Sequence, residues 1–101
     1  MNNSHFEKFE NESYEQYTYL AIMEFSEDRV SIEFPDFEGA FVYSDIDNAI
    51  SDAEILLEDC IINYKIDGVK LPKSTEKGVI KLNQKKEKEI FITAYVDIDA
   101  K

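Results

Sequence analysis

The sequence predicts a single α+β domain with the element order β-β-β-α-β and a mixed sheet that carries one long helix on one face. Three observations predict this class. The chain has 101 residues, which suits one domain with one core. Apolar residues make up 44% of it, enough to fold without covalent staples. The spacing of apolar residues changes along the chain from strand-like to helical and back to strand-like.

The first two strands are expected to form a hairpin. Residues 16–25 are rich in β-branched, aromatic and other apolar side chains. Residues 29–34 alternate between polar and apolar side chains, which is typical of a strand with one buried face. The polar residues 26–28 between the two runs suit a turn.

A second turn and a short third strand follow. Pro35 has no N–H to give to a ladder, so the second strand is expected to end there. Gly39 can supply the positive φ of a turn. Residues 40–43 are then expected to form the third strand.

The helix is predicted at residues 45–66, with Ser44 as its N-cap and Gly68 at its C-terminal end. Its apolar side chains recur at helical spacing. They are Ile46, Ala49, Ile50, Ala53, Leu56, Leu57, Cys60, Ile61 and Tyr64. Because Cys60 lies in this stripe and no histidine is near it, we expect a core residue and not a nucleophile.

The remaining chain supplies a lysine-rich loop and a fourth strand. Residues 73–89 are weakly patterned, with a short turn expected near residues 79–82. Residues 90–98 alternate again and are expected to form a strand that the helix reaches by a right-handed crossover. Residues 1–15 are polar and acidic and are expected to be a flexible tail, which leaves residues 16–101 as the folded domain.

Both faces of the sheet are predicted to be apolar, although one helix can cover only one of them. In the first strand, Leu20 and Ile22 point to one face, while the residues between and beside them point to the other. A second copy of the chain is the simplest cover for the open face. We therefore expect a homodimer. Its interface residues are predicted to be Tyr19, Ala21, Met23, Phe91 and Tyr95.

The charge is strongly negative and unevenly spread. The chain has 11 Lys and Arg against 22 Asp and Glu, a net charge of −11. Residues 24–59 contain twelve acids and one basic residue, Arg29, whereas residues 65–101 contain nine Lys and six acids. This balance argues against whole-surface binding to nucleic acid or anionic lipid, and it favours a basic partner.

Several chemistries are not expected. One Cys and one His cannot form an internal disulfide or a structural zinc site. No nucleophile–base pair and no phosphate-binding loop is recognisable, so we expect neither an enzyme nor a cofactor. The start of the chain is unlike a signal peptide, and no apolar run approaches the roughly 20 residues that cross a bilayer. The expected location is the cytoplasm.

One motif gives a family resemblance. The hexapeptide FPDFEG at residues 34–39 is followed by a short strand, an acidic helix start with Ala49, and Leu71-Pro72. This order over residues 17–74 resembles the HicB antitoxin family, whose turn has the pattern F-P-D-x-x-G. The resemblance implies a truncated ribonuclease-H-like sheet with one helix. It also implies binding and neutralisation of HicA, a small basic toxin of double-stranded-RNA-binding fold that cleaves mRNA.

The resemblance directs attention to the second turn as the toxin-binding site. The expected contributors are Glu33, Asp36, Phe37 and Glu38, with Phe37 as an apolar anchor between acids. Two alternatives stay open: the Phe37 ring folds back onto the core, or Asp36 only stabilises the turn. Most members of the family also carry a C-terminal DNA-binding domain. None follows the fourth strand here, so no specific DNA binding is expected of this chain alone.

Three rival functions remain. Carboxylates on the first strand and helix could imitate the metal site of a ribonuclease-H-like enzyme, but the helix acids are spread over its exposed side. Residues 65–88 contain eight Lys and three acids and could contact RNA phosphates. Because they lack Arg and interleaved aromatic residues, a solvated loop is favoured. The third rival is an orphan interaction module encoded by a phage or mobile element.

Overall fold

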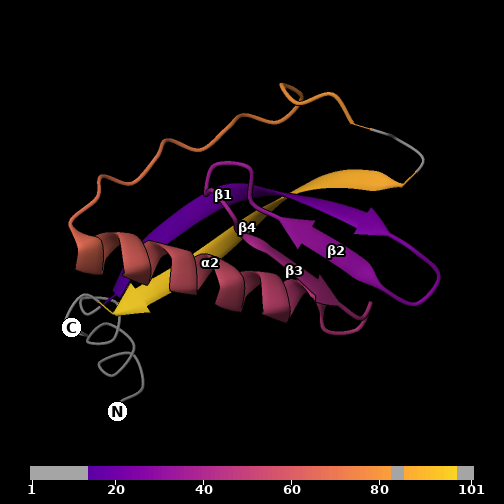
Figure 1. Ribbon diagram of the computed structural model, residues 1–101, viewed down its shortest axis with the longest axis horizontal. Helices are drawn as coiled ribbons and strands as arrows, with labels where there is room; N and C mark the ends of the chain where they lie inside the picture. Colours follow the sequence, from indigo (N-terminus) through magenta and orange to yellow (C-terminus); the bar gives the residue numbers. More distant parts are fainter. Residues whose placement is uncertain (1–13, 83–85, 98–101) are drawn as a thin grey trace, which may run out of the picture.

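The computed structural model describes residues 14–82 and 86–97, which form a four-stranded sheet with one long helix packed on one face (Figure 1). The elements are β1 (Tyr14–Phe25), β2 (Val30–Glu33), β3 (Phe41–Ser44), α2 (Ala49–Asp67) and β4 (Glu87–Asp97). The predicted order β-β-β-α-β is confirmed. β1 begins two residues before the predicted strand, and the rest of the predicted tail, residues 1–13, lies outside the described residues.

The sheet is antiparallel throughout, so the prediction of a mixed sheet was wrong. The strand order is β3-β2-β1-β4, and β1 pairs antiparallel with both β2 and β4. The predicted right-handed crossover was wrong for the same reason, because such a crossover joins parallel strands and β4 runs opposite to β3. Residues 69–82 carry the chain back along the molecule after α2 and before β4 begins (Figure 1). This return path reverses the direction of the last strand.

The helix begins later than predicted, at Ala49, and Ser44 is not its N-cap. Ser44 ends β3, is buried, and donates a hydrogen bond from Oγ to Oδ2 of Asp52 at 2.6 Å. A turn lies between strand and helix, where the Asp45 carboxylate accepts the Asn48 backbone N–H at 2.8 Å. At the other end, Gly68 has φ 72° and caps the helix, as predicted.

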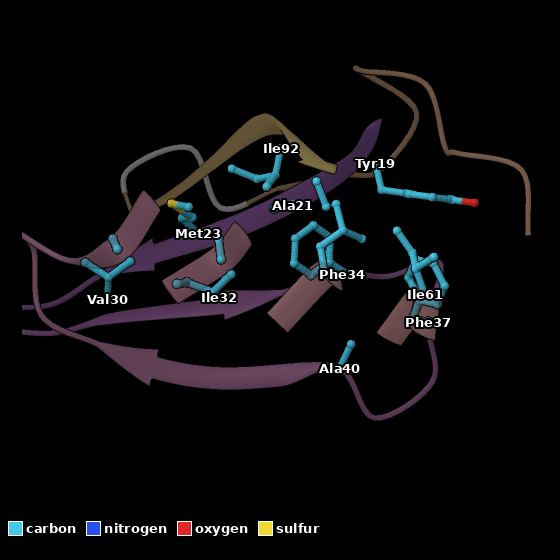
Figure 2. Packing of buried hydrophobic residues seen from close by; sticks show 14 of the residues in the cluster. Tyr19, Ala21, Met23, Val30, Ile32, Phe34, Phe37, Ala40, Ile61 and Ile92 are labelled. Atoms are coloured by element: carbon cyan, nitrogen blue, oxygen red, sulfur yellow. The ribbon is translucent and has the colours of Figure 1, made fainter. Parts of the chain in front are cut away.

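The core lies between α2 and the sheet (Figure 2). The helix contributes Ala49, Ala53, Leu57 and Ile61, spaced by four residues, so they lie on one face. Cys60 is half-buried and packs against this cluster, and burial raises the pKa of its thiol, as does the neighbouring Asp59. The sheet and the turn between β2 and β3 contribute Tyr19, Ala21, Met23, Val30, Ile32, Phe34, Phe37, Ala40, Ile92, Ala94 and Val96 to this cluster.

The predicted dimer surface is therefore wrong for three of its five residues. Tyr19, Ala21 and Met23 lie beneath α2 and are at most 5% exposed. The pairing of Tyr19 with Ile92 puts both side chains on the helix side. Both faces of β1 are apolar, so alternation alone could not indicate which face the helix covers.

The opposite face, called the open face below, carries the other half of the strand residues. Phe91 and Tyr95, the other two residues of the predicted interface, lie here and are 47% and 59% exposed. On β3, the rings of Phe41 and Tyr43 meet edge to face at 5.1 Å, and the Arg29 guanidinium lies 4.8 Å from the Tyr43 ring centre. From β1, Leu20 and Ile22 alternate onto this face, where Leu20 is fully buried and Ile22 is partly buried. In the described part of the chain, no helix is long and apolar enough to cross a membrane.

Candidate protein-binding surface

The turn between β2 and β3 is held by its own backbone. Phe37 N–H donates to the Phe34 carbonyl at 3.0 Å, and Ala40 N–H donates to the Phe37 carbonyl at 3.1 Å. Gly39 has φ 80°, a left-handed conformation that favours glycine, as predicted. The turn is therefore a fixed structure, and its side chains have defined directions.

Phe37 points inward and cannot anchor a partner. Its ring is 2% exposed and meets Tyr19 at 4.7 Å and Tyr64 at 5.2 Å, both edge to face. Figure 2 shows Phe37 in the core near Ile61 of α2. The predicted anchor role of Phe37 was wrong, and the alternative that its ring folds back onto the core is confirmed. The reason is that a large aromatic ring gains more by burial than by exposure at a turn.

Asp36 holds two distant segments together. Its Oδ2 accepts the Thr75 backbone N–H at 2.8 Å, and its Oδ1 accepts the Thr75 hydroxyl at 2.5 Å. Nearby, the Tyr19 hydroxyl donates to the Pro72 carbonyl at 2.5 Å. Burial, and secondarily the Asp36 charge, raises the pKa of the Tyr19 phenol, which favours the protonated donor. Both acceptor atoms of Asp36 thus serve the fold, which favours a structural role over direct partner contact.

Glu33 and Glu38 are the turn acids that remain accessible. Glu33 ends β2, projects from the open face beside Ile22 and Phe41, and is exposed. Glu38 lies in the turn and is exposed too. Of the four predicted partner-binding residues, these two are placed to meet another protein. The fold brings them to the same end of β2, where the half-exposed ring of Phe41 lies beside Glu33.

A second acidic surface was missed in the sequence. A groove of about 360 Å³ lies between α2 and β4, lined by Ser51, Glu54, Ile55, Glu58 and residues 93–95. The helix residues 51, 54, 55 and 58 are three or four positions apart, so they form one stripe along the helix. This stripe lies next to the buried stripe of residues 49, 53, 57 and 61. The sequence shows Glu54 and Glu58 on either side of Ile55, but only the fold places these residues beside the edge strand β4.

The described residues offer no assembled metal site. Within residues 14–82 and 86–97, no group of three or more His, Cys, Asp or Glu side chains could hold a metal ion. The lysine-rich segment is extended rather than helical, and Lys70, Lys73, Lys77 and Lys81 are exposed along it. Part of this segment, residues 83–85, lies outside the described residues.

Comparison with solved structures gives an informative match. No family model matches the sequence, and no curated protein matches it. Among solved structures, a chain of a "HicA3 and HicB3 toxin-antitoxin complex" superposes with a TM-score of 0.57 and 19% sequence identity. The match covers 80% of this chain and 99% of the other. This chain is therefore similar in fold to a chain of a toxin–antitoxin complex.

Proposed function

We propose that this protein is an antitoxin that binds and neutralises a small, basic, mRNA-cleaving toxin of the HicA type. The observation that carries the proposal is the fold shared with a chain of a toxin–antitoxin complex. The FPDFEG turn supports it from the sequence side. Charge then favours the antitoxin over the toxin, because an mRNA-cleaving protein needs cationic surface and this chain has a net charge of −11.

The proposed action is binding, without catalysis or cofactor, in the cytoplasm. The toxin's RNA-binding surface is cationic, so an acidic protein can occupy it in place of RNA phosphates. Glu33 and Glu38 are the exposed turn acids and supply rim charges that steer the approach. Phe37 and Asp36 act indirectly by holding the turn that carries them.

The proposal is tested with a candidate toxin from a neighbouring gene. Co-expression should restore the growth of cells that the toxin arrests. Binding kinetics should weaken at higher salt, and Glu33→Lys or Glu38→Lys should slow association more than it speeds dissociation. Asp28→Lys is the matched control, because it makes the same charge change at an exposed position in the turn between β1 and β2. Binding that salt and both reversals leave unchanged would contradict the proposal.

We also propose a homodimer through the open face. Phe41 and Tyr43 on β3 and Phe91 and Tyr95 on β4 lie on that face and are about half exposed, which gives a partner apolar surface at both edges of the sheet. The side chains Tyr19, Ala21 and Met23 take no part, since they are buried beneath α2.

A further inference from the structure

We infer that the free edge of β4 accepts an extended, lysine- or arginine-bearing segment of a partner protein as a fifth strand, with its basic side chains in the groove beside α2. The edge is available because β4 is the last strand in the order β3-β2-β1-β4. The inference goes beyond the proposed function, because it concerns any cationic partner that can form a strand.

The hydrogen-bond pattern shows which backbone groups face the free edge. Phe25 N–H donates to the Lys86 carbonyl at 3.0 Å, so this pair is bonded across β1 and β4. Bonded pairs alternate in an antiparallel ladder. The register then shows that the even-numbered residues of β4 form backbone hydrogen bonds with β1. The odd-numbered residues Phe91, Thr93 and Tyr95 therefore direct their N–H and C=O groups away from β1, toward the free edge. Within the described residues, no other backbone group bonds to these three.

The edge lacks the features that normally prevent strand addition. Residues 90–96, IFITAYV, contain no charge, proline or glycine and have high β-propensity. Such an edge is a template for another strand. The sheet's other edge differs, since β3 has only four residues and the acidic residues Asp45 and Asp47 follow it closely.

The groove indicates the chemistry of the added strand. Glu54 and Glu58 stand one helical turn apart on its wall, with Ile55 exposed between them. Among residues 14–82 and 86–97, neither carboxylate has a cationic partner. A strand added to β4 places alternate side chains on the helix side, where these two carboxylates complement lysine or arginine. Its other side chains extend the aromatic open face.

A second copy of this chain fits the edge less well. Antiparallel pairing of two β4 strands places the two-fold axis perpendicular to the sheet, so both α2 helices lie on the same side. Glu54 and Glu58 of each copy would then line one shared trough. Like charges brought together in this way disfavour the pairing.

The test uses the full chain and a ten-residue peptide of alternating valine and lysine, with an alternating valine and glutamate peptide as control. Amide hydrogen exchange is followed by NMR. The lysine peptide should slow exchange at the amides of Phe91, Thr93 and Tyr95, while Ile90, Ile92 and Ala94, already bonded to β1, serve as internal references. The glutamate peptide should not. A bound lysine peptide that leaves the three edge amides unprotected would overturn the inference.

Two pairs of variants sharpen the test. Thr93→Pro removes an outward N–H without touching the β1 ladder and should weaken peptide binding about tenfold or more. Thr93→Ala, which loses the same hydroxyl contact to Thr18 but keeps the N–H, should bind as the wild type does. Glu54→Lys with Glu58→Lys should also weaken binding, and the control Asp59→Lys should not. Equal binding by both Thr93 variants, or edge protection that grows with protein concentration alone, would contradict a partner strand.

The outcome is separable from the proposed function. If a toxin binds the Thr93→Pro variant as well as the wild type and leaves the edge amides unprotected, the antitoxin role stands but the β4 edge is not the toxin-binding site. If the lysine peptide protects the edge amides but no toxin binds the protein, the inference about the β4 edge stands and the antitoxin role is contradicted.

Discussion

The two faces of the sheet have similar apolar content and opposite surroundings. On the helix side, Ala21 and Ala94 lie in the core with Ala53 of α2, and all three are at most 2% exposed. On the open face, Phe91 and Tyr95 keep about half of their surface in solvent. On β4 the difference lies in side-chain size: Ala94 lets the helix approach the sheet closely, whereas the large rings of Phe91 and Tyr95 stand on the face that no helix covers. Along β4, side-chain size as well as hydrophobicity indicates which face is covered.

The largest expected effect comes from removing a ring on the covered side. Phe37→Ala should lower the free energy of unfolding by about 3–5 kcal/mol, because it leaves a cavity among Tyr19, Tyr64 and Ile61. Phe41→Ala on the open face is the matched control and should cost far less, since half of that ring is already in water. Urea unfolding measures both. An equal decrease in unfolding free energy for Phe37→Ala and Phe41→Ala would contradict the difference between the two faces.

The next effect concerns the end of the sheet, where the chain passes from α2 toward β4. Asp36→Ala should cost about 1–3 kcal/mol, because it leaves the Thr75 N–H and hydroxyl without their carboxylate acceptor. Limited proteolysis should then cut residues 69–82 faster than in the wild type. Glu38→Ala, in the same turn but exposed, should change neither measurement. An unchanged cleavage rate would mean that Asp36 does not secure this segment.

Charged substitutions on the open face should change the association of two copies of the chain and leave the stability of the fold nearly unchanged. Phe91→Lys with Tyr95→Lys should alter the free energy of unfolding by about 0.5 kcal/mol or less per site, as usual for exposed positions. The same double variant should dissociate the proposed homodimer, which sedimentation at tens of micromolar measures. A wild-type protein that sediments as a monomer at that concentration would rule out the dimer.

The smallest effect is expected at the rim of the covered face. Glu15 accepts a hydrogen bond from the Tyr17 hydroxyl and pairs with Lys65 at 2.9 Å, and both contacts lower the pKa of its carboxyl from 4.5. A lowered folded-state pKa contributes stability above the unfolded value, which is lost as the pH falls through the folded value. The difference in unfolding free energy between wild type and Glu15→Gln should therefore shrink below pH 4.5. A difference that is constant with pH would contradict this.

Much of the fold could be predicted from the sequence because it rests on local signals. Alternation located the strands, helical spacing located α2, and Gly39 and Gly68 marked left-handed positions. The direction of β4 could not be predicted, because it depends on the path of residues 69–82, which carry no periodicity. The helix start was also misplaced, because Ser44 suits a cap as well as it suits a buried strand end.

The candidate site was harder to predict than the fold. Phe37 stands between acids in a turn, and only the fold reveals the aromatic pocket formed by Tyr19 and Tyr64. Asp36 has a partner 39 residues away, which no local pattern can indicate. Glu33 and Glu38 were identified from charge alone, and both are exposed in the structure.

The long pairing of β1 with β4 has a consequence for how the chain folds. Tyr14 pairs with Asp97 and Ile22 with Glu89, so these contacts join residues far apart in the sequence. β2 pairs only with residues 22–25 of β1, which leaves the first half of β1 without a neighbour until β4 arrives. Contacts of such high sequence separation form slowly. During synthesis the first half of β1 therefore has no strand neighbour until β4 has been made.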